Sequence, residues 1–262
     1  MAERLNVALV GAAGVVGAPA HLNALAAIPR AKLYALCDTN RERLQEIGRE
    51  RKVSVLYSSL DEVLADERVD AVSLATPPYL HAEQAIAAAE AGRHVYCEKP
   101  MALSVGDCRR MVEAARRAGV VLMVGESYVF TGSHMLARAL IDGGEIGEVV
   151  HVRETKGVWV FTPEEERRLG GKGHEGVRWR CDPKLSGGGE HPWMMDHGPH
   201  LFALARYLAQ DRAVARVTAL PGAGKAITAV AWSYEGGEAD GVWTQVDTPA
   251  EATDLIGFRT EV

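Results

Sequence analysis

The chain has 262 residues, of which 47% are hydrophobic and 24% are charged, the composition of an ordinary globular protein with room for two hydrophobic cores. Its formal net charge of −6 argues against a nucleic-acid partner, because binding to phosphates requires a surplus of lysine and arginine on one face. Because no apolar run approaches the roughly 20 residues that cross a bilayer, and because the four cysteines form no CxxC pair, we expect a cytoplasmic protein with reduced thiols and no membrane partner.

Residues 5–125 alternate short apolar runs with stretches that carry helix signals. The runs are almost continuously apolar, as expected for strands of a parallel sheet that is covered on both faces. Two Ser-x-x-acid sequences, beginning at Ser59 and Ser104, resemble capping boxes, and Gly119 follows the second as a helix stop. This alternation predicts βαβ units and a doubly wound parallel sheet. We expect it to form a first, dinucleotide-binding domain of residues 1–125.

The alternation of short apolar runs with helix signals ends after Val124. Residues 133–141 predict one helix, a strand-like run covers residues 147–161, and a second helix is expected near residues 196–209. Strands clustered in sequence with few helices predict an open, mostly antiparallel sheet with helices on one face. We expect a second, α+β domain of residues 126–262 that binds the substrate. Its remaining strands are predicted, between Gly and Pro turns, at residues 213–219, 226–234 and 241–247.

A glycine-rich turn follows the first expected strand and opens the first expected helix. Gly11, Gly14 and Gly17 have GxxGxxG spacing in place of GxGxxG, with Ala13 where the middle glycine usually stands. A dinucleotide phosphate needs a tight turn, a backbone that it can approach closely and amides at a helix N-terminus, and these small residues suit all three. The same pattern also occurs in plain strand-to-helix connections. The turn residues expected at the cofactor are Gly11, Ala12, Ala13, Gly14, Val15 and Val16.

The second expected strand ends in Asp38, about 20 residues after the last glycine, where an acid hydrogen-bonds to the adenosine ribose. Because an aspartate at this position repels a 2′-phosphate, NAD is favoured as the cofactor, with NADP as the alternative. Arg41 and Arg43 are arguable ligands of such a phosphate, but we interpret them as solvated helix charges. Asp38 itself has an alternative interpretation as a helix N-cap or turn residue.

The fifth expected strand ends with Glu98-Lys99-Pro100, at the carboxyl edge of a parallel sheet, where doubly wound folds bind their ligands. A salt-bridged pair at the sheet edge is the alternative. EKP after AGRHVYC, preceded by ATPPYLH, is similar to the signature of the Gfo/Idh/MocA oxidoreductases, which include glucose–fructose oxidoreductase and inositol 2-dehydrogenase. The resemblance continues through GESYVF, DGGEIGEVV and SGGG…MDHGPHLF, and therefore covers nearly the whole chain.

The resemblance implies a Rossmann domain that binds a nicotinamide cofactor and a catalytic role for Lys99, since the family's EKP lysine touches the substrate hydroxyl near the nicotinamide. It also implies that the peptide before Pro100 is often cis. Because family members line the cleft just after the last Rossmann strand, Glu126 and Tyr128 are expected to contact the substrate. Further cofactor contacts are expected at Thr76, Pro77, Pro78, His81, Glu98 and Lys99.

A histidine-rich segment begins the second helix of the second domain. In a helix that starts near Asp196, His197 falls within the apolar stripe, whereas Asp196 and His200 share the flank beside it. An Asp–His pair facing a cleft suits general acid–base chemistry, and the D-x-x-x-H of the family matches the same two residues. We predict that His200 takes the hydroxyl proton, assisted by Asp196, while Lys99 stabilises the alkoxide and hydride leaves for the nicotinamide. The stripe comprises Leu201, Leu204, Ala205 and Leu208.

A metal site is the rival interpretation of this segment. His191, Asp196, His197 and His200 are four potential ligands within ten residues, and histidine with carboxylate suits zinc or iron. Because the stripe turns His197 inward, the set is broken and we expect no metal. Trp159 and His197 are the remaining candidates for substrate contact, with core packing as the alternative.

These features predict an NAD(P)-dependent dehydrogenase or reductase acting on a secondary alcohol or ketone of a sugar, inositol or related cyclic polyol or glycoside. The alternative is a non-catalytic dinucleotide-binding sensor or scaffold, which the irregular glycine turn would suit. Family members usually continue beyond the point where DLIGFRTEV ends, so the chain is expected to be either naturally short or truncated. A sheet face left exposed would favour association, and we expect a homo-oligomer, either a dimer or a tetramer.

Overall fold

The computed structural model describes residues 4–14, 17–157, 192–221, 227–246 and 259–261, which divide into two compact units. The division falls between Gly125 and Glu126. We call the described residues up to Gly125 the first unit and those from Glu126 onward the second unit. Within these residues, no helix is long and apolar enough to cross a bilayer.

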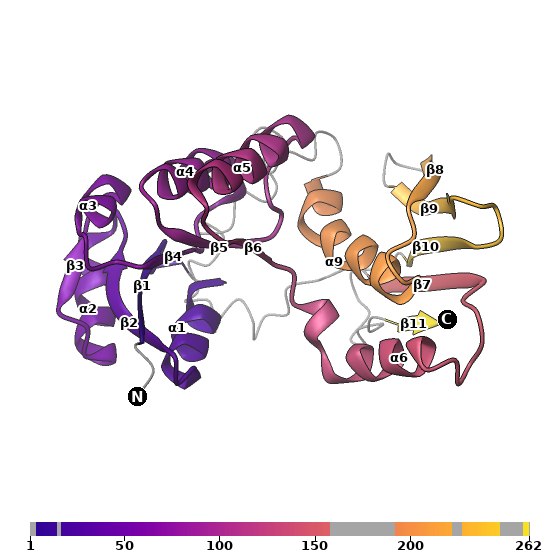
Figure 1. Cartoon of the computed structure of the whole chain (residues 1–262), viewed down its shortest axis with the longest axis horizontal. Helices are drawn as coiled ribbons and strands as arrows, with labels where there is room; N and C mark the ends of the chain where they lie inside the picture. The colour runs from indigo at the N-terminus through magenta and orange to yellow at the C-terminus, as the bar shows by residue number, and fades with distance from the viewer. Residues whose placement is uncertain (1–3, 15–16, 158–191, 222–226, 247–258, 262) are drawn as a thin grey trace. The chain divides into compact units, whose positions relative to one another are not determined.

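The first unit is a six-stranded parallel sheet with helices on both faces (Figure 1). The strands lie in the order β3-β2-β1-β4-β5-β6, and the prediction of a doubly wound sheet is confirmed. The strands are β1 (Leu5–Val10), β2 (Ala31–Cys37), β3 (Val55–Tyr57), β4 (Ala71–Leu74), β5 (His94–Glu98) and β6 (Leu122–Gly125). The helices are α1 (Gly17–Ala27), α2 (Arg41–Arg51), α3 (Leu60–Ala65), α4 (Pro78–Glu90) and α5 (Val105–Ala118).

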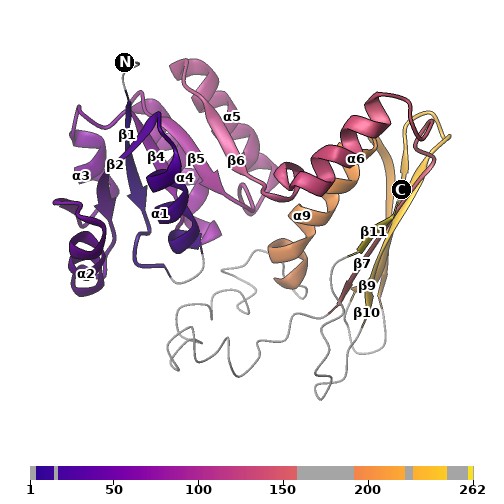
Figure 2. The same ribbon diagram turned by 90° about the horizontal axis from the view of Figure 1, so that it is seen from below.

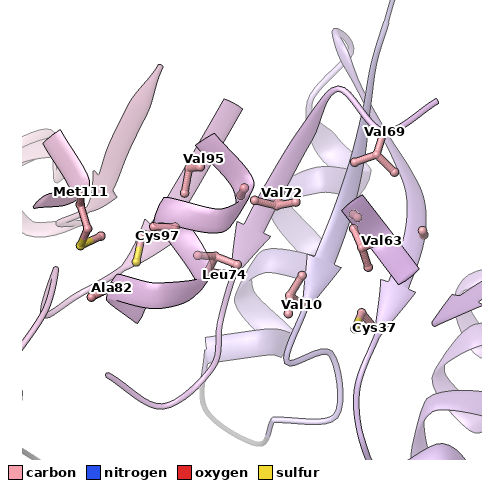
Figure 3. Close-up of a cluster of buried hydrophobic side chains, with 14 of the residues drawn as sticks. Val10, Cys37, Val63, Val69, Val72, Leu74, Ala82, Val95, Cys97 and Met111 are labelled. Atoms are coloured by element: carbon pink, nitrogen blue, oxygen red, sulfur yellow. The ribbon is translucent and has the colours of Figure 1, made fainter. Parts of the chain in front are cut away.

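Alternate residues of the central strand β1 enter two different cores. Val10 packs into the cluster formed with α3, α4 and α5, which Figure 3 shows together with Val63 and Met111. Leu9 packs on the opposite face, with Leu22 of α1. Because successive side chains of a strand point to opposite faces, a strand covered on both sides must be apolar throughout. This explains the continuous apolar runs of the sequence.

The helix boundaries follow the capping signals. The hydroxyl of each predicted cap accepts a hydrogen bond from the backbone amide three residues later, at 3.3 Å for Ser59 and 3.0 Å for Ser104. The reciprocal bond of the first box is displaced by one residue, since the Glu62 carboxylate accepts from the Ser58 amide at 2.7 Å. Gly119 ends α5 with a φ of 67°, as predicted for a left-handed helix stop.

The second unit is a five-stranded sheet with two helices on one face (Figure 2). Its strands lie in the order β11-β7-β10-β9-β8, and only the β7–β10 pair among them is parallel, so the predicted mostly antiparallel sheet is confirmed. The strands are β7 (His151–Gly157), β8 (Val214–Pro221), β9 (Ile227–Tyr234), β10 (Asp240–Val246) and β11 (Arg259–Glu261). The helices are the 3-10 turn η1 (Tyr128–Phe130), α6 (Gly132–Asp142) and α9 (Pro192–Leu208).

Helix α9 provides most of the helical contribution to the core of the second unit. Its predicted apolar stripe is confirmed, because Leu201, Leu204, Ala205 and Leu208 are at most 2% exposed. They pack with Trp232 and Trp243 of the sheet. The helix begins at Pro192, four residues before the predicted start. Proline is favoured in the first helical turn, where no intrahelical bond needs its missing N–H, so Pro192 is the sequence signal that marks this start.

Candidate functional site

The glycine-rich turn lies at the carboxyl end of β1, beside the end of β4. Gly11 has a φ of +83°, and a Cβ there would lie 2.8 Å from the backbone carbonyl of Ala75, so only glycine allows this close approach. The Gly14 amide donates to the Gly11 carbonyl at 3.0 Å and closes the turn before α1 begins at Gly17. The turn predicted to meet the cofactor thus comprises Gly11, Ala12, Ala13 and Gly14, whereas Val15 and Val16 lie outside the described residues.

Asp38 directly follows β2 and holds the glycine turn. Its Oδ2 accepts a hydrogen bond from the Ala13 amide at 2.9 Å, and its Oδ1 accepts from the Asn40 amide at 2.8 Å. Asn40 is the residue that caps α2, since its side chain accepts from the Arg43 amide. The N-cap alternative for Asp38 is therefore wrong, and the residue joins two turns. Its contact with an adenosine ribose stays a prediction.

The order of the first sheet reverses between β1 and β4, the place where doubly wound sheets bind ligands beyond the carboxyl ends of their strands. Three turns follow these two strands and the next strand, β5: residues 11–14 after β1, Thr76 to Pro78 after β4, and Lys99 with Pro100 after β5. The residues of the turn at Gly11 have small side chains or none, and the acid Asp38 follows the neighbouring strand β2. These features fit a bound dinucleotide.

His81 lies one turn into α4 and has no exposed surface. Its Nδ1 is 2.9 Å from the carbonyl oxygen of Pro100, and its Nε2 is 2.8 Å from that of Thr76. Burial lowers the pKa of His81 against the opposing effect of these two carbonyl groups. The sequence placed His81 in direct contact with the cofactor. In the structure the imidazole is enclosed and connects the turn after β4 to the turn after β5, and its contact with the cofactor stays a prediction.

Glu98 ends β5 and is followed by Lys99 and Pro100, which a cis peptide bond joins, as the resemblance implied. Glu98 Oε1 lies 2.7 Å from Nε2 of His21, and its Oε2 accepts from the backbone amide of Lys99 at 3.1 Å. Burial raises the pKa of Glu98, but the hydrogen bond and charge of His21, together with the charge and backbone amide of Lys99, outweigh burial and leave this pKa below its ordinary value. The bonds described for Glu98 thus differ from the simple Glu98–Lys99 salt bridge considered from the sequence.

In the second unit, His200 of α9 is 9% exposed and is held by two residues near the start of the unit. Its Nδ1 lies 2.6 Å from Oε1 of Glu126, and the ring of Tyr128 stacks on the imidazole with centroids 4.2 Å apart and 12° between the planes. The same Glu126 oxygen accepts from the Tyr128 amide at 3.1 Å. Within the described residues, Nε2 of His200 has no hydrogen-bond partner. A ring held in this way has one nitrogen on a carboxylate and the other available for proton transfer.

Glu126 is thus the described carboxylate partner of His200, although the sequence assigned that role to Asp196. Asp196 lies on α9 one turn before His200, but its side chain is outside the described part of the structure, and its role stays a prediction. Glu126 and Tyr128, predicted as substrate contacts, bind His200 itself. His197 is partly buried on α9. Trp159 lies outside the described residues.

The metal interpretation depended on a cluster of histidine and carboxylate side chains. Among the described residues, no group of three or more His, Cys, Asp or Glu side chains is arranged to hold a metal ion. His191 and the side chain of Asp196 fall outside that description. The absence of a metal therefore stays a prediction.

Glu154 of β7 is a buried acid that the sequence analysis missed. Its side chain has no exposed surface, and neither carboxylate oxygen has a hydrogen-bond partner in the described structure. It shares the helix-facing side of β7 with Val152 and lies in register with Trp243 of β10. Burial raises the pKa of Glu154 to about 8. The period-two pattern of HVRETK would have identified it, because Glu154 stands two residues after the apolar Val152.

Glu154 should make the stability of the second unit depend on pH. In the unfolded chain this carboxyl titrates near its ordinary pKa of about 4.3, whereas in the folded unit its pKa is about 8. Between these values the folded state binds one more proton than the unfolded state, so the free energy of unfolding falls as pH rises. We expect Glu154→Gln to remove this dependence and to stabilise the unit by on the order of 5 kcal/mol at pH 8.

Urea unfolding followed by tryptophan fluorescence measures this effect, since Trp232 and Trp243 lie in the same core. The control is Glu148→Gln, which neutralises an exposed glutamate six residues earlier and should leave the pH profile unchanged. Identical pH profiles for wild type and Glu154→Gln would contradict the assignment.

A doubly wound parallel sheet with this turn, joined to a mixed sheet that carries a histidine–carboxylate pair, has the architecture of two-domain dinucleotide-binding oxidoreductases. Residues 5–126 match the family model described as the oxidoreductase family with an NAD-binding Rossmann fold. Residues 134–252 match the Gfo/Idh/MocA C-terminal domain. The chain belongs to the Gfo/Idh/MocA family, and the resemblance inferred from its motifs is confirmed.

The named relatives align with different lengths of this chain. Levoglucosan dehydrogenase from Pseudarthrobacter phenanthrenivorans is 32% identical over 218 residues, which cover 80% of this chain and 52% of that protein. Myo-inositol 2-dehydrogenase from Thermotoga maritima is 33% identical over 145 residues, 55% of this chain and 42% of that protein. The 2,7-anhydro-N-acetylneuraminate hydratase of Escherichia coli is 42% identical over 123 residues, 47% of this chain and 33% of that protein. The chain therefore spans about half or less of each of these relatives.

Solved structures match over a larger part of the chain. The WlbA dehydrogenase from Bordetella pertussis, in complex with NADH and UDP-GlcNAcA, has a TM-score of 0.79 at 30% identity and covers 95% of this chain and 69% of its own. A levoglucosan dehydrogenase in complex with NADH and levoglucosan has a TM-score of 0.79 at 27% identity and covers 98% of this chain and 71% of its own. Both likenesses extend over the two units.

Proposed function

We propose that this chain carries an NAD-dependent dehydrogenase or reductase activity on a secondary alcohol or ketone of a sugar, inositol or related cyclic polyol or glycoside. The observation that carries the proposal is the His200–Glu126 pair, at 2.6 Å, in the second unit. A protein that only binds a dinucleotide has no need of a buried base oriented by a carboxylate. Relatives and neighbours named as levoglucosan and inositol dehydrogenases support the substrate class.

His200, Glu126 and Lys99 each have a separate role in the proposed reaction. His200 accepts the hydroxyl proton at Nε2, and Glu126 on Nδ1 stabilises the imidazolium that results. The positive charge of Lys99 stabilises the negative charge that develops on the substrate oxygen. NAD, when bound, takes up the hydride from the carbon, and the reverse reaction reduces a ketone. Asp38 supports NAD over NADP, because its carboxylate repels a 2′-phosphate.

A screen of NAD and NADP against sugars, inositols, glycosides and their keto forms tests the proposal. We expect NADH absorbance with at least one polyol and a strong preference for NAD. Thermal stabilisation by NAD without turnover of any compound would instead support the sensor or scaffold alternative. Product analysis by mass spectrometry, run in parallel, detects a net hydration, the reaction named for one of the relatives.

The proposal also includes a homo-oligomer, a cytoplasmic location and a small-molecule partner. Association is supported by apolar side chains on the edge strand β8, where Val217 is 62% and Leu220 is 53% exposed. Sedimentation velocity at micromolar concentration distinguishes a dimer or tetramer from a stable monomer, and a stable monomer would contradict this part of the proposal.

A further inference from the structure

His21 is a buried histidine that the catalytic scheme leaves without a role. It lies on α1, the helix that follows the glycine turn, and is 6% exposed. Its Nδ1 is 2.7 Å from the hydroxyl oxygen of Ser73 on β4, and its Nε2 is 2.7 Å from Oε1 of Glu98 at the end of β5. The edge of its ring meets the ring of Tyr96, with centroids 5.4 Å apart and 67° between the planes. One imidazole thus connects the first helix to two strands of the sheet.

The contacts of His21 extend through Glu98 to the backbone of Lys99. The second oxygen of Glu98 accepts a hydrogen bond from the Lys99 amide at 3.1 Å, so the carboxylate binds His21 on one side and the lysine backbone on the other. The carboxylate is three-quarters or more shielded, with 24% of its side chain exposed. A shielded carboxylate needs such partners to stay ionised, and hydrogen bonds from ionised groups are stronger and better defined in direction than neutral ones.

A second histidine holds the next residue from the opposite side of the sheet. His81 of α4 contacts the carbonyl oxygen of Pro100 at 2.9 Å. Helices α1 and α4 pack on different faces, as their separate cores show, with Leu22 in one and Ala82 in the other. The Lys99–Pro100 dipeptide is therefore held at its amide through His21 and at its carbonyl by His81.

We infer that His21 is a positioning residue for Lys99, acting through Glu98. The inference rests on the proposed function, in which Lys99 stabilises the alkoxide. The imidazole holds the Glu98 carboxylate in place, and the carboxylate holds the Lys99 amide. The lysine side chain therefore extends from a backbone whose position is fixed. Because α1 begins at the proposed cofactor turn, His21 also joins the segment that receives the dinucleotide to the segment that carries the lysine.

The test compares His21→Leu, which removes both ring nitrogens, with His21→Gln, which keeps a hydrogen-bonding group. Each is measured for kcat, KM, NAD affinity and the hydrogen exchange of the Lys99 amide, resolved by fragmentation mass spectrometry. We expect His21→Leu to lower kcat roughly ten- to hundredfold, the scale of a small misplacement of a reacting group, with NAD affinity changed less than about threefold. The Lys99 amide should exchange faster, and His21→Gln should recover part of both effects.

The matched control is His94→Gln, at the other end of β5, where the Nδ1 of His94 accepts from the Val121 amide at 3.0 Å. It should leave kcat and the exchange of Lys99 unchanged. Unaltered exchange and kcat in His21→Leu would overturn the inference, as would an equal loss in the control. If His21→Leu does not fold, Glu98→Gln and His21→Gln must still speed exchange at Lys99. The exchange measurement is also independent of the proposed function, because it reports the hydrogen bond between the Lys99 amide and Glu98 even if no substrate is turned over.

Discussion

Replacing Lys99 with methionine should remove hydride transfer while the protein continues to bind NAD. Methionine keeps most of the length and apolar volume of lysine but lacks its charge and its N–H donors, so the change removes the groups that would stabilise the substrate oxygen. Groups that stabilise developing negative charge at a reacting oxygen typically contribute a hundred- to thousandfold to kcat. We therefore expect turnover of the best substrate to fall by roughly a factor of 100 to 1,000. Steady-state kinetics and a separate titration of NAD measure the two parts of the prediction.

The control for Lys99→Met is Lys32→Met. Lys32 is an exposed lysine near the amino end of β2, with its ammonium group 5.4 Å from the centroid of the Tyr34 ring. It lies at the sheet edge opposite Lys99, so its replacement should leave kcat and KM unaltered. Full turnover in Lys99→Met would exclude the lysine from the chemistry. A parallel loss in both variants would point to a general effect of charge.

The fold was predictable because its signals are local. Ser59, Ser104 and Gly119 mark helix ends through bonds that span three or four residues, and such bonds are visible in the sequence. Strand β1 is apolar throughout because it is buried on two faces, with Leu9 and Val10 in different cores. The family motifs predicted the role of Lys99, and helical spacing together with those motifs predicted the role of His200; both roles stay predictions.

The partners of those residues were not predictable in the same way. Helical spacing can only propose neighbours three or four positions away, and it proposed Asp196 for His200. The bond described by the structure comes from Glu126, 74 positions earlier in the chain. His21 and Glu98 are similarly separated by 77 positions. These contacts depend on which element packs against which, and a single sequence does not state that.

The pairing of His200 with Glu126 leads to the second large effect. Replacing His200 with alanine should lower kcat roughly a hundred- to ten-thousandfold, the range for a positioned general base. Because the substitution leaves space for a small base, added imidazole should restore part of the activity. The control is His151→Ala, since His151 is also bonded to a carboxylate, Asp240, but its side chain is 47% exposed. It should keep the wild-type kcat and gain nothing from imidazole.

Glu126→Gln tests the orienting role of the carboxylate with the base left in place. The amide occupies the same volume but cannot stabilise the imidazolium, so we expect a smaller loss in kcat, about ten- to hundredfold, with KM little changed. Glu145→Gln, at an exposed glutamate of the same unit, is the matched control. Asp196→Asn, measured beside it, decides whether the aspartate also assists. Wild-type turnover in Glu126→Gln would show that the 2.6 Å contact does not serve proton transfer, and a full loss in Asp196→Asn would return the assisting role to the aspartate.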